Sequence, residues 1–283
     1  MEASVPSPPP PTLDVLLGAG DHAPLGPADD TVLAGLYEAP PGQAWVRANM
    51  VSSVDGGAWG PDHRSGTIND DADQRVFRVL RSLADVVLIG AGTARAEGYT
   101  ALDAPEDLAH LRGARGRLEL AVVSRSGRLP ATLAGSDRPP FVLTGSRGAA
   151  VARRAVPDDR VLEIGRADEP DSPDLAAGLA RLAGRGLRHV LCEGGPHLLA
   201  DMLAADLVDE LCLTTTPVLV GAGPGRVVAG AAPAAGEASA PPAGARLVHL
   251  LHARGTLLAR WHLRPGDDAS HPAAQYPVAV GRG

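Results

Sequence analysis

Two strand-to-helix transitions, about a hundred residues apart, constrain the fold of this chain more than any other feature. The first is the apolar run at 86–89, which ends in Gly90-Ala-Gly-Thr93. The second is the run at 189–192, which ends in Glu193-Gly-Gly-Pro196. A short apolar run bounded by glycines is typical of a strand buried on both faces of a parallel sheet. Two such turns at one sheet edge can hold a dinucleotide between them and place one carboxylate beside it.

Strand and helix patterns alternate along the chain, which indicates an α/β protein with a mainly parallel mixed sheet between two helical layers. Strands are predicted at 45–50, 86–89, 118–123, 141–143, 161–164, 189–192 and 211–216, and helices at 31–37, 70–83, 147–155, 174–185 and 196–205. A C-terminal antiparallel hairpin is predicted at 246–252 and 256–263, adding edge strands. We expect a proline-rich, partly disordered extension at 1–42, a compact domain at 43–265, which the resemblance described below makes the catalytic one, and a tail at 266–283.

The composition and the absence of certain motifs exclude several classes of function. The formal net charge of −7 disfavours a nucleic-acid surface. The two cysteines, Cys192 and Cys212, lie in apolar runs, which is typical of buried free thiols in a reducing compartment. We find no apolar run near the length of a membrane span, no signal peptide and no metal-binding motif, so we expect a cytoplasmic protein without a metal.

The turns supply candidate site residues. Free amides around Gly194, Gly195 and Pro196 favour a phosphate at the start of a helix, with Glu193 at the strand end. An ordinary tight turn with a solvated Glu193 fits this motif equally well. Asp55, in Ser-Val-Asp-Gly56, is either a catalytic acid or a residue that shapes the turn. No complete dinucleotide-binding fingerprint of the G-x-G-x-x-G type is present.

Taken together, these motifs resemble the reductase half of the bifunctional deaminase–reductase of riboflavin biosynthesis and its stand-alone pyrimidine reductase relatives. The resemblance covers 45–263 and depends on the segments 53–56, 80–93, 193–196, 207–210 and 217–221. It implies a dihydrofolate-reductase-like fold, NADPH as the cofactor, a small, anionic heterocyclic substrate and a homodimer with a seam at 208–215.

The resemblance also assigns roles to individual residues. The catalytic residues are Glu193 and Asp55, and the substrate contacts are Asn49, Ser65, Arg81 and Glu193. The cofactor contacts are Thr67, Gly90, Gly92, Thr93, Glu97, Ser124, Arg125, Gly194, Gly195, Pro196, His197, Leu198 and Leu199. Ser124 and Arg125 would grip the 2′-phosphate of NADPH. The Gly194–Gly195 peptide bond is expected to be cis.

Two departures leave the substrate open. The family places a lysine where this chain has Asn49, and a basic phosphate-binding stretch where this chain has residues 97–102. A dihydrofolate, pteridine or secondary-metabolite reductase on the same fold is therefore an alternative to the pyrimidine reductase. A third hypothesis is a catalytically idle NADP-binding protein.

Overall fold

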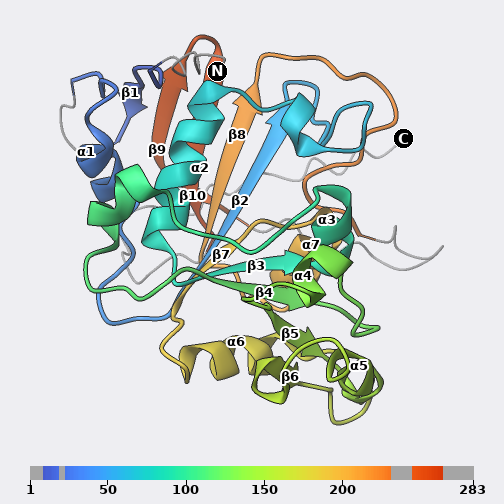
Figure 1. The fold of residues 1–283 in the computed structure, drawn as a ribbon. Coiled ribbons are helices and arrows are strands. Elements are labelled where there is room, and N and C mark those ends of the chain that lie inside the picture. The colour runs from blue at the N-terminus through green and yellow to red at the C-terminus, as the bar shows by residue number, and fades with distance from the viewer. Residues whose placement is uncertain (1–8, 19–22, 231–243, 264–283) are drawn as a thin grey trace, which may run out of the picture.

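The computed structural model describes residues 9–18, 23–230 and 244–263, which contain one ten-stranded sheet with helices on both faces (Figure 1). The strands are β1 (Asp14–Leu17), β2 (Trp45–Ser53), β3 (Val86–Gly90), β4 (Glu119–Val123), β5 (Phe141–Thr144), β6 (Val161–Glu163), β7 (His189–Cys192), β8 (Glu210–Thr216), β9 (Arg246–Ala253) and β10 (Thr256–His262). The α-helices are α1 (Asp30–Gly35), α2 (Asp71–Leu83), α3 (Ala91–Ala96), α4 (Ala131–Ala134), α5 (Ser146–Ala152), α6 (Leu175–Ala183) and α7 (Pro196–Ala204). Short 3₁₀ helices are η1 (Ser65–Thr67), η2 (Glu106–Arg112) and η3 (Asp158–Arg160).

The strand order is β1-β9-β10-β8-β2-β7-β3-β4-β5-β6. Every neighbouring pair from β8 to β6 is parallel, whereas β10, β9 and β1 add antiparallel pairs. Arg254 and Gly255 both have positive φ at the tip of the β9–β10 hairpin, as a tight two-residue hairpin turn requires. The predicted mainly parallel mixed sheet with a C-terminal hairpin is confirmed.

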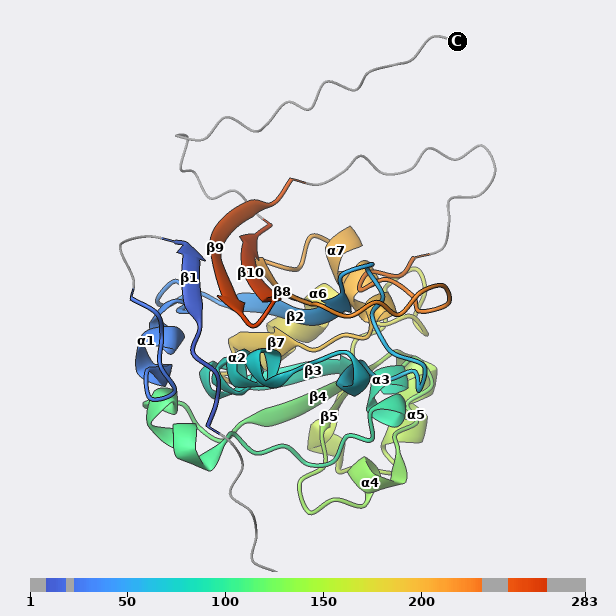
Figure 2. The ribbon, with the colours of Figure 1, turned by 90° about the horizontal axis from the view of Figure 1, so that it is seen from above.

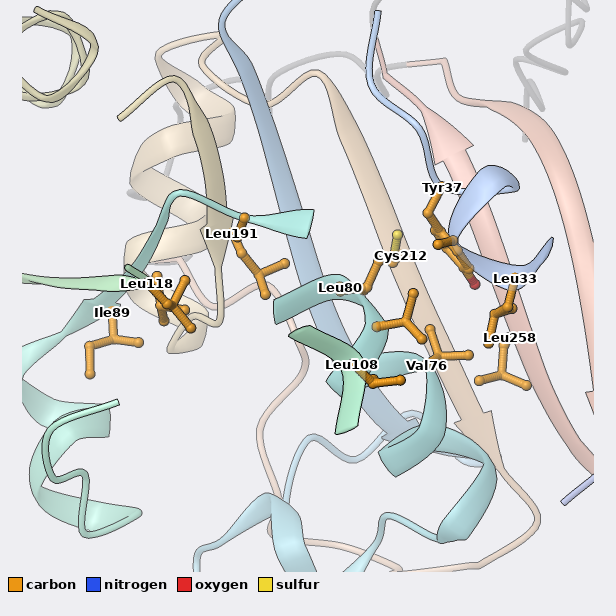
Figure 3. Close-up of a cluster of buried hydrophobic side chains, with 14 of the residues drawn as sticks. Leu33, Tyr37, Val76, Leu80, Ile89, Leu108, Leu118, Leu191, Cys212 and Leu258 are labelled. Atoms are coloured by element: carbon orange, nitrogen blue, oxygen red, sulfur yellow. The ribbon is translucent and has the colours of Figure 1, made fainter. Parts of the chain in front are cut away.

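Helices pack on both faces, as the three-layer prediction requires. On one face, α1, α2 and α3 bury a cluster that includes Leu80, Leu191 and Leu258 (Figure 3). On the other face, α6 and α7 bury Leu182, Leu199 and Met202 (Figure 2). The Asp70 side chain caps α2 by accepting from the amides of Ala72 and Asp73.

Residues 9–18 and 23–42 belong to the folded domain, which differs from the predicted boundary. Leu13, Leu33 and Tyr37 are fully buried in the cluster beneath α2. β1 pairs with β9, so the outer edge of the sheet is β1 and the hairpin lies inside it. The prolines that suggested an extension do not prevent this pairing, because most of them precede the strand. The expected disorder at 1–8 and the tail at 266–283 lie outside the described residues.

A buried charged cluster joins this N-terminal segment to the sheet. The Glu210 side chain is fully buried and bonds to Arg47 and Arg260. The arginines also donate to the carbonyl groups of Tyr37 and Leu36 just beyond α1. Burial opposes ionisation of Glu210, but the two guanidinium groups outweigh it and lower its pKa to about 2.

Candidate active site

A cavity of about 700 Å³ opens at the carboxyl ends of β2, β7 and β3, the edge where parallel α/β sheets bind ligands. Most of the predicted site residues lie on its wall. Those that line it are Asn49, Ser65, Arg81, Gly90, Gly92, Thr93, Glu97, Glu193, Gly195, Pro196, His197 and Leu198. These residues come from β2, η1, α2 and the two glycine turns, so the sheet order brings together segments that are far apart in the sequence.

An ion pair forms one wall of the cavity. Arg81 donates from Nε and Nη2 to the two carboxylate oxygens of Glu193, each at 2.8 Å. The Tyr99 hydroxyl donates to Glu193 Oε2 at 2.6 Å. The guanidinium group also lies 4.2 Å from the ring centre of Phe77. Burial lowers the pKa of Arg81, but its bonds to Glu193 raise it further, so the net shift is upward.

The two glycine turns meet on the cavity wall directly after Glu193. The Gly90 amide donates to the Gly194 carbonyl at 2.8 Å, and the Gly194–Gly195 peptide bond is cis as expected. A Cβ at residue 195 would lie 2.4 Å from Thr93 Oγ1, so only glycine permits this approach. A Cβ at residue 92 would meet nothing within 4 Å. Backbone at Gly92 thus faces open space, as a phosphate cradle requires.

Ser65 and Glu97 bond directly to each other. The amide and hydroxyl of Ser65 both donate to Glu97 Oε1, at 3.0 and 3.1 Å. This contact fixes η1 against the residue that follows α3. It joins a predicted substrate residue to a predicted cofactor residue at the mouth of the cavity.

Six predicted residues do not line the cavity. They are Asp55, Thr67, Ser124, Arg125, Gly194 and Leu199. Asp55 accepts from Ser53 Oγ and from the amides of Val220 and Gly221, so its carboxylate anchors a loop. Asp55 therefore has the contacts of a residue that shapes a turn. It does not line the cavity, where we expect a catalytic residue to lie. Thr67 bonds instead to Asp62 and Arg64.

The other four flank the cavity. The Ser124 hydroxyl donates to the Arg128 carbonyl, and Arg125 is exposed, with Asp201 of α7 at 3.6 Å. β4 lies beside β3, so Arg125 follows the next strand at the same sheet edge. Gly194 contributes its carbonyl to Gly90, and the Leu199 side chain is buried in the core under α7.

Asp73, Phe77 and Tyr99 are among the residues of the cavity wall that sequence reasoning missed. Asp73, Phe77 and Arg81 follow one another at intervals of four along α2, which places them on one helix face. That spacing was visible in the sequence, but it did not show that this face meets the cavity. Nothing in the sequence linked Tyr99 to Glu193.

Comparisons with known proteins agree with this geometry. A family model described as the RibD C-terminal domain matches residues 44–247. The 2,5-diamino-6-ribosylamino-4(3H)-pyrimidinone 5′-phosphate reductase of Archaeoglobus fulgidus is 25% identical over 186 residues, covering 62% of this chain and 82% of that protein.

Solved structures with a similar fold include a pyrimidine reductase-like protein from Corynebacterium diphtheriae. It has a TM-score of 0.65 and 23% identity, with 79% of this chain and 93% of that one covered. RibD of Acinetobacter baumannii has a TM-score of 0.58 and 19% identity, and the match covers 80% of this chain but 59% of RibD. The predicted family and fold are confirmed.

Proposed function

The chain belongs to the RibD C-terminal domain family, and we propose that it is an oxidoreductase that reduces a ribosylaminopyrimidine 5′-phosphate with NADPH. The observation that carries this proposal is the cavity itself. Its wall carries both the open glycine turns and the Arg81–Glu193–Tyr99 cluster. The turns would hold a dinucleotide, and the cluster would hold a small heterocycle.

The cofactor fits the glycine turns. The amides that begin α3 and α7 face the cavity around Gly92 and Pro196, and such helix starts favour phosphate groups. Thr93 and Glu97 lie beside them. Arg125, exposed at the same sheet edge, would pair with the 2′-phosphate of NADPH. When bound, the reduced nicotinamide supplies a hydride.

The Arg81–Glu193–Tyr99 cluster would hold the substrate. Glu193 Oε1 accepts from Arg81, and Oε2 accepts from Arg81 and Tyr99, so a lone pair of Oε1 would be left to accept an N–H group of a pyrimidine. Asn49 offers both a donor and an acceptor to the same ring. Ser65, at the mouth, would contact the ribosyl phosphate. Most of the rate enhancement in such a site comes from orienting the substrate.

A direct assay tests the function. Purified protein is mixed with NADPH and the ribosylaminopyrimidine 5′-phosphate, and the loss of NADPH absorbance is followed together with the appearance of the ribityl product. We expect stoichiometric turnover. Binding of NADPH without oxidation in the presence of this substrate would contradict the proposal.

A dihydrofolate or other pteridine substrate is the second candidate. Asn49 favours it, because this cavity wall lacks the lysine expected for a phosphorylated substrate. The same assay with dihydrofolate separates the two. No oxidation with either substrate would instead favour an idle NADP-binding protein.

We further propose that the protein is a cytoplasmic homodimer. Leu211, Leu213 and Leu257 lie on one face of β8 and β10 and stay partly exposed, which a second copy would cover. Cys192 and Cys212 are buried free thiols, in keeping with a reducing compartment. No helix among the described residues has the length and apolarity to cross a membrane. Sedimentation equilibrium measures the oligomeric state.

A further inference from the structure

We propose that Asp73, in the first turn of α2, donates the proton that completes the reduction in this cavity. The inference rests on the proposed function, because a proton donor is needed only where a substrate accepts a hydride. It assigns to Asp73 the proton transfer that the strand-end acid Glu193 was expected to perform.

The position of Asp73 supports this role. Its side chain lines the cavity beside Asn49 of β2, and the residue is 6% exposed. Phe77 and Arg81 lie one and two turns further along the same face of α2. Asp73 therefore opens onto the space that the Arg81–Glu193 pair bounds.

The contacts of Glu193 favour a positioning role. Arg81 holds both of its oxygens with two hydrogen bonds of 2.8 Å, and Tyr99 donates a third. These three bonds hold the carboxylate in place, which suits Glu193 to orienting a substrate.

Asp73 has the opposite surroundings. None of the ion pairs formed by the described residues includes it, and the charged group that acts on it is the carboxylate of Asp70, at the cap of its own helix. β8 presents the Thr214 hydroxyl and β2 presents Asn49, which are both uncharged. Burial, followed by Asp70, raises the pKa of Asp73 to about 6, although Thr214 lowers it. Asp73 is therefore a buried acid whose pKa of about 6 lets it hold and release a proton within about one pH unit of neutrality, as a general acid must.

The proposed reaction needs one such proton. The reduced nicotinamide gives a hydride to C1′ of the ribosylamine, the C1′–O bond of the sugar ring breaks, and its electron pair stays on the oxygen. Asp73 transfers its carboxyl proton to that oxygen, which becomes a hydroxyl. The resulting Asp73 carboxylate then takes a proton from water, so atoms and charge balance over the cycle.

The test compares wild type with Asp73→Asn, which keeps the size and polarity of the side chain but has no acidic proton. NADPH oxidation with the ribosylaminopyrimidine phosphate is measured from mildly acidic to alkaline pH. For wild type, we expect kcat/KM to fall tenfold per pH unit above the pKa of about 6. For Asp73→Asn, we expect kcat to fall by about 10²–10⁴-fold and this pH dependence to disappear.

A second readout does not depend on activity. Since the pKa of Asp73 is higher in the folded state than in the unfolded chain, wild type should lose stability as pH rises from about 4 to about 6. In thermal unfolding, Asp73→Asn should show no such loss of stability over this pH range. Asp71→Asn, an exposed residue of the same helix turn, is the matched control and should behave as wild type in both measurements.

The outcomes separate the two proposals. If wild type is active and Asp73→Asn has the same rate, the role of Asp73 is overturned and the proposed function stands. A slower Asp73→Asn variant that keeps the pH dependence of wild type leads to the same conclusion. A wild type that binds neither NADPH nor NADH removes the proposed function, and the role of Asp73 with it. Equal NADPH affinity of wild type and Asp73→Asn, with the loss confined to turnover, supports the inference.

Discussion

Arg81 and Glu193 are 112 residues apart in the chain and form a two-pronged ion pair with both N–O distances at 2.8 Å. Arg81 is on the helix that covers the sheet, and Glu193 directly follows a central strand. The pair therefore fixes α2 relative to β7 at the wall of the cavity. Each side chain is mostly buried, at 19% and 4% exposure, so solvent screens the pair little.

Replacing Glu193 with Gln tests the role of this pair. The variant leaves the Arg81 guanidinium partly buried without its carboxylate and weakens the orientation of the substrate. We expect kcat/KM to fall roughly 10- to 100-fold, the equivalent of one lost charge-assisted bond, with NADPH affinity nearly unchanged. Steady-state kinetics and a calorimetric NADPH titration measure both. Glu106→Gln, on an exposed part of η2, is the control.

Replacing Gly195 with Ala tests the contact between the glycine turns. The added methyl group would lie 2.4 Å from Thr93 Oγ1, so Thr93 or α7 must shift. We expect a loss of about 1–3 kcal/mol of stability and weaker NADPH binding. Gly35→Ala, where the added carbon meets nothing within 4 Å, should cost nothing. Equal NADPH affinity of Gly195→Ala and wild type would argue against a cofactor at this turn.

Replacing Arg125 with Ala tests the choice between NADPH and NADH. The Arg125 side chain is exposed, and its contact with Asp201 is long, at 3.6 Å. A 2′-phosphate can therefore reach the guanidinium group from solvent. We expect the NADPH dissociation constant to rise about tenfold while that of NADH stays constant, because a solvent-exposed contact contributes modestly. Fluorescence titration with both cofactors measures the ratio. Arg147→Ala removes an equally exposed arginine paired with Asp171 and should leave the ratio unchanged.

Replacing Glu210 with Gln tests the buried cluster. The variant leaves the buried guanidinium groups of Arg47 and Arg260 without their carboxylate, which typically costs about 3–5 kcal/mol. Because the pKa of Glu210 is lowered to about 2, its contribution is present above the unfolded value of 4.5 and is lost as pH falls toward 2. Urea unfolding at neutral and acidic pH measures both effects. Glu169→Gln, at an exposed position, is the control. If Glu210→Gln is as stable as wild type at neutral pH, the cluster adds no net stability.

Local patterns were sufficient for most of the strands and for the longer helices. Apolar runs ending in glycines identified β3 and β7, and Asp70 marked the start of α2, because strand periodicity and helix capping depend on neighbours in the chain. The family resemblance then identified Arg81, Thr93 and Gly195, which all line the cavity. Patterns were less informative before residue 43, where a high proline content concealed β1 and a buried part of the core.

The sequence by itself determined most of the strands, the positions of the glycine turns and the carboxylate that follows β7, since each of these is set by a few adjacent residues. Only the tertiary structure decided that Tyr99 and Arg81 engage Glu193, that Asp55 anchors a loop, and that Asp73 is a buried acid outside the ion pairs of the described residues. These outcomes depend on desolvation and on contacts between distant segments. Both arise when the sheet order β8-β2-β7-β3 brings those segments together at one edge.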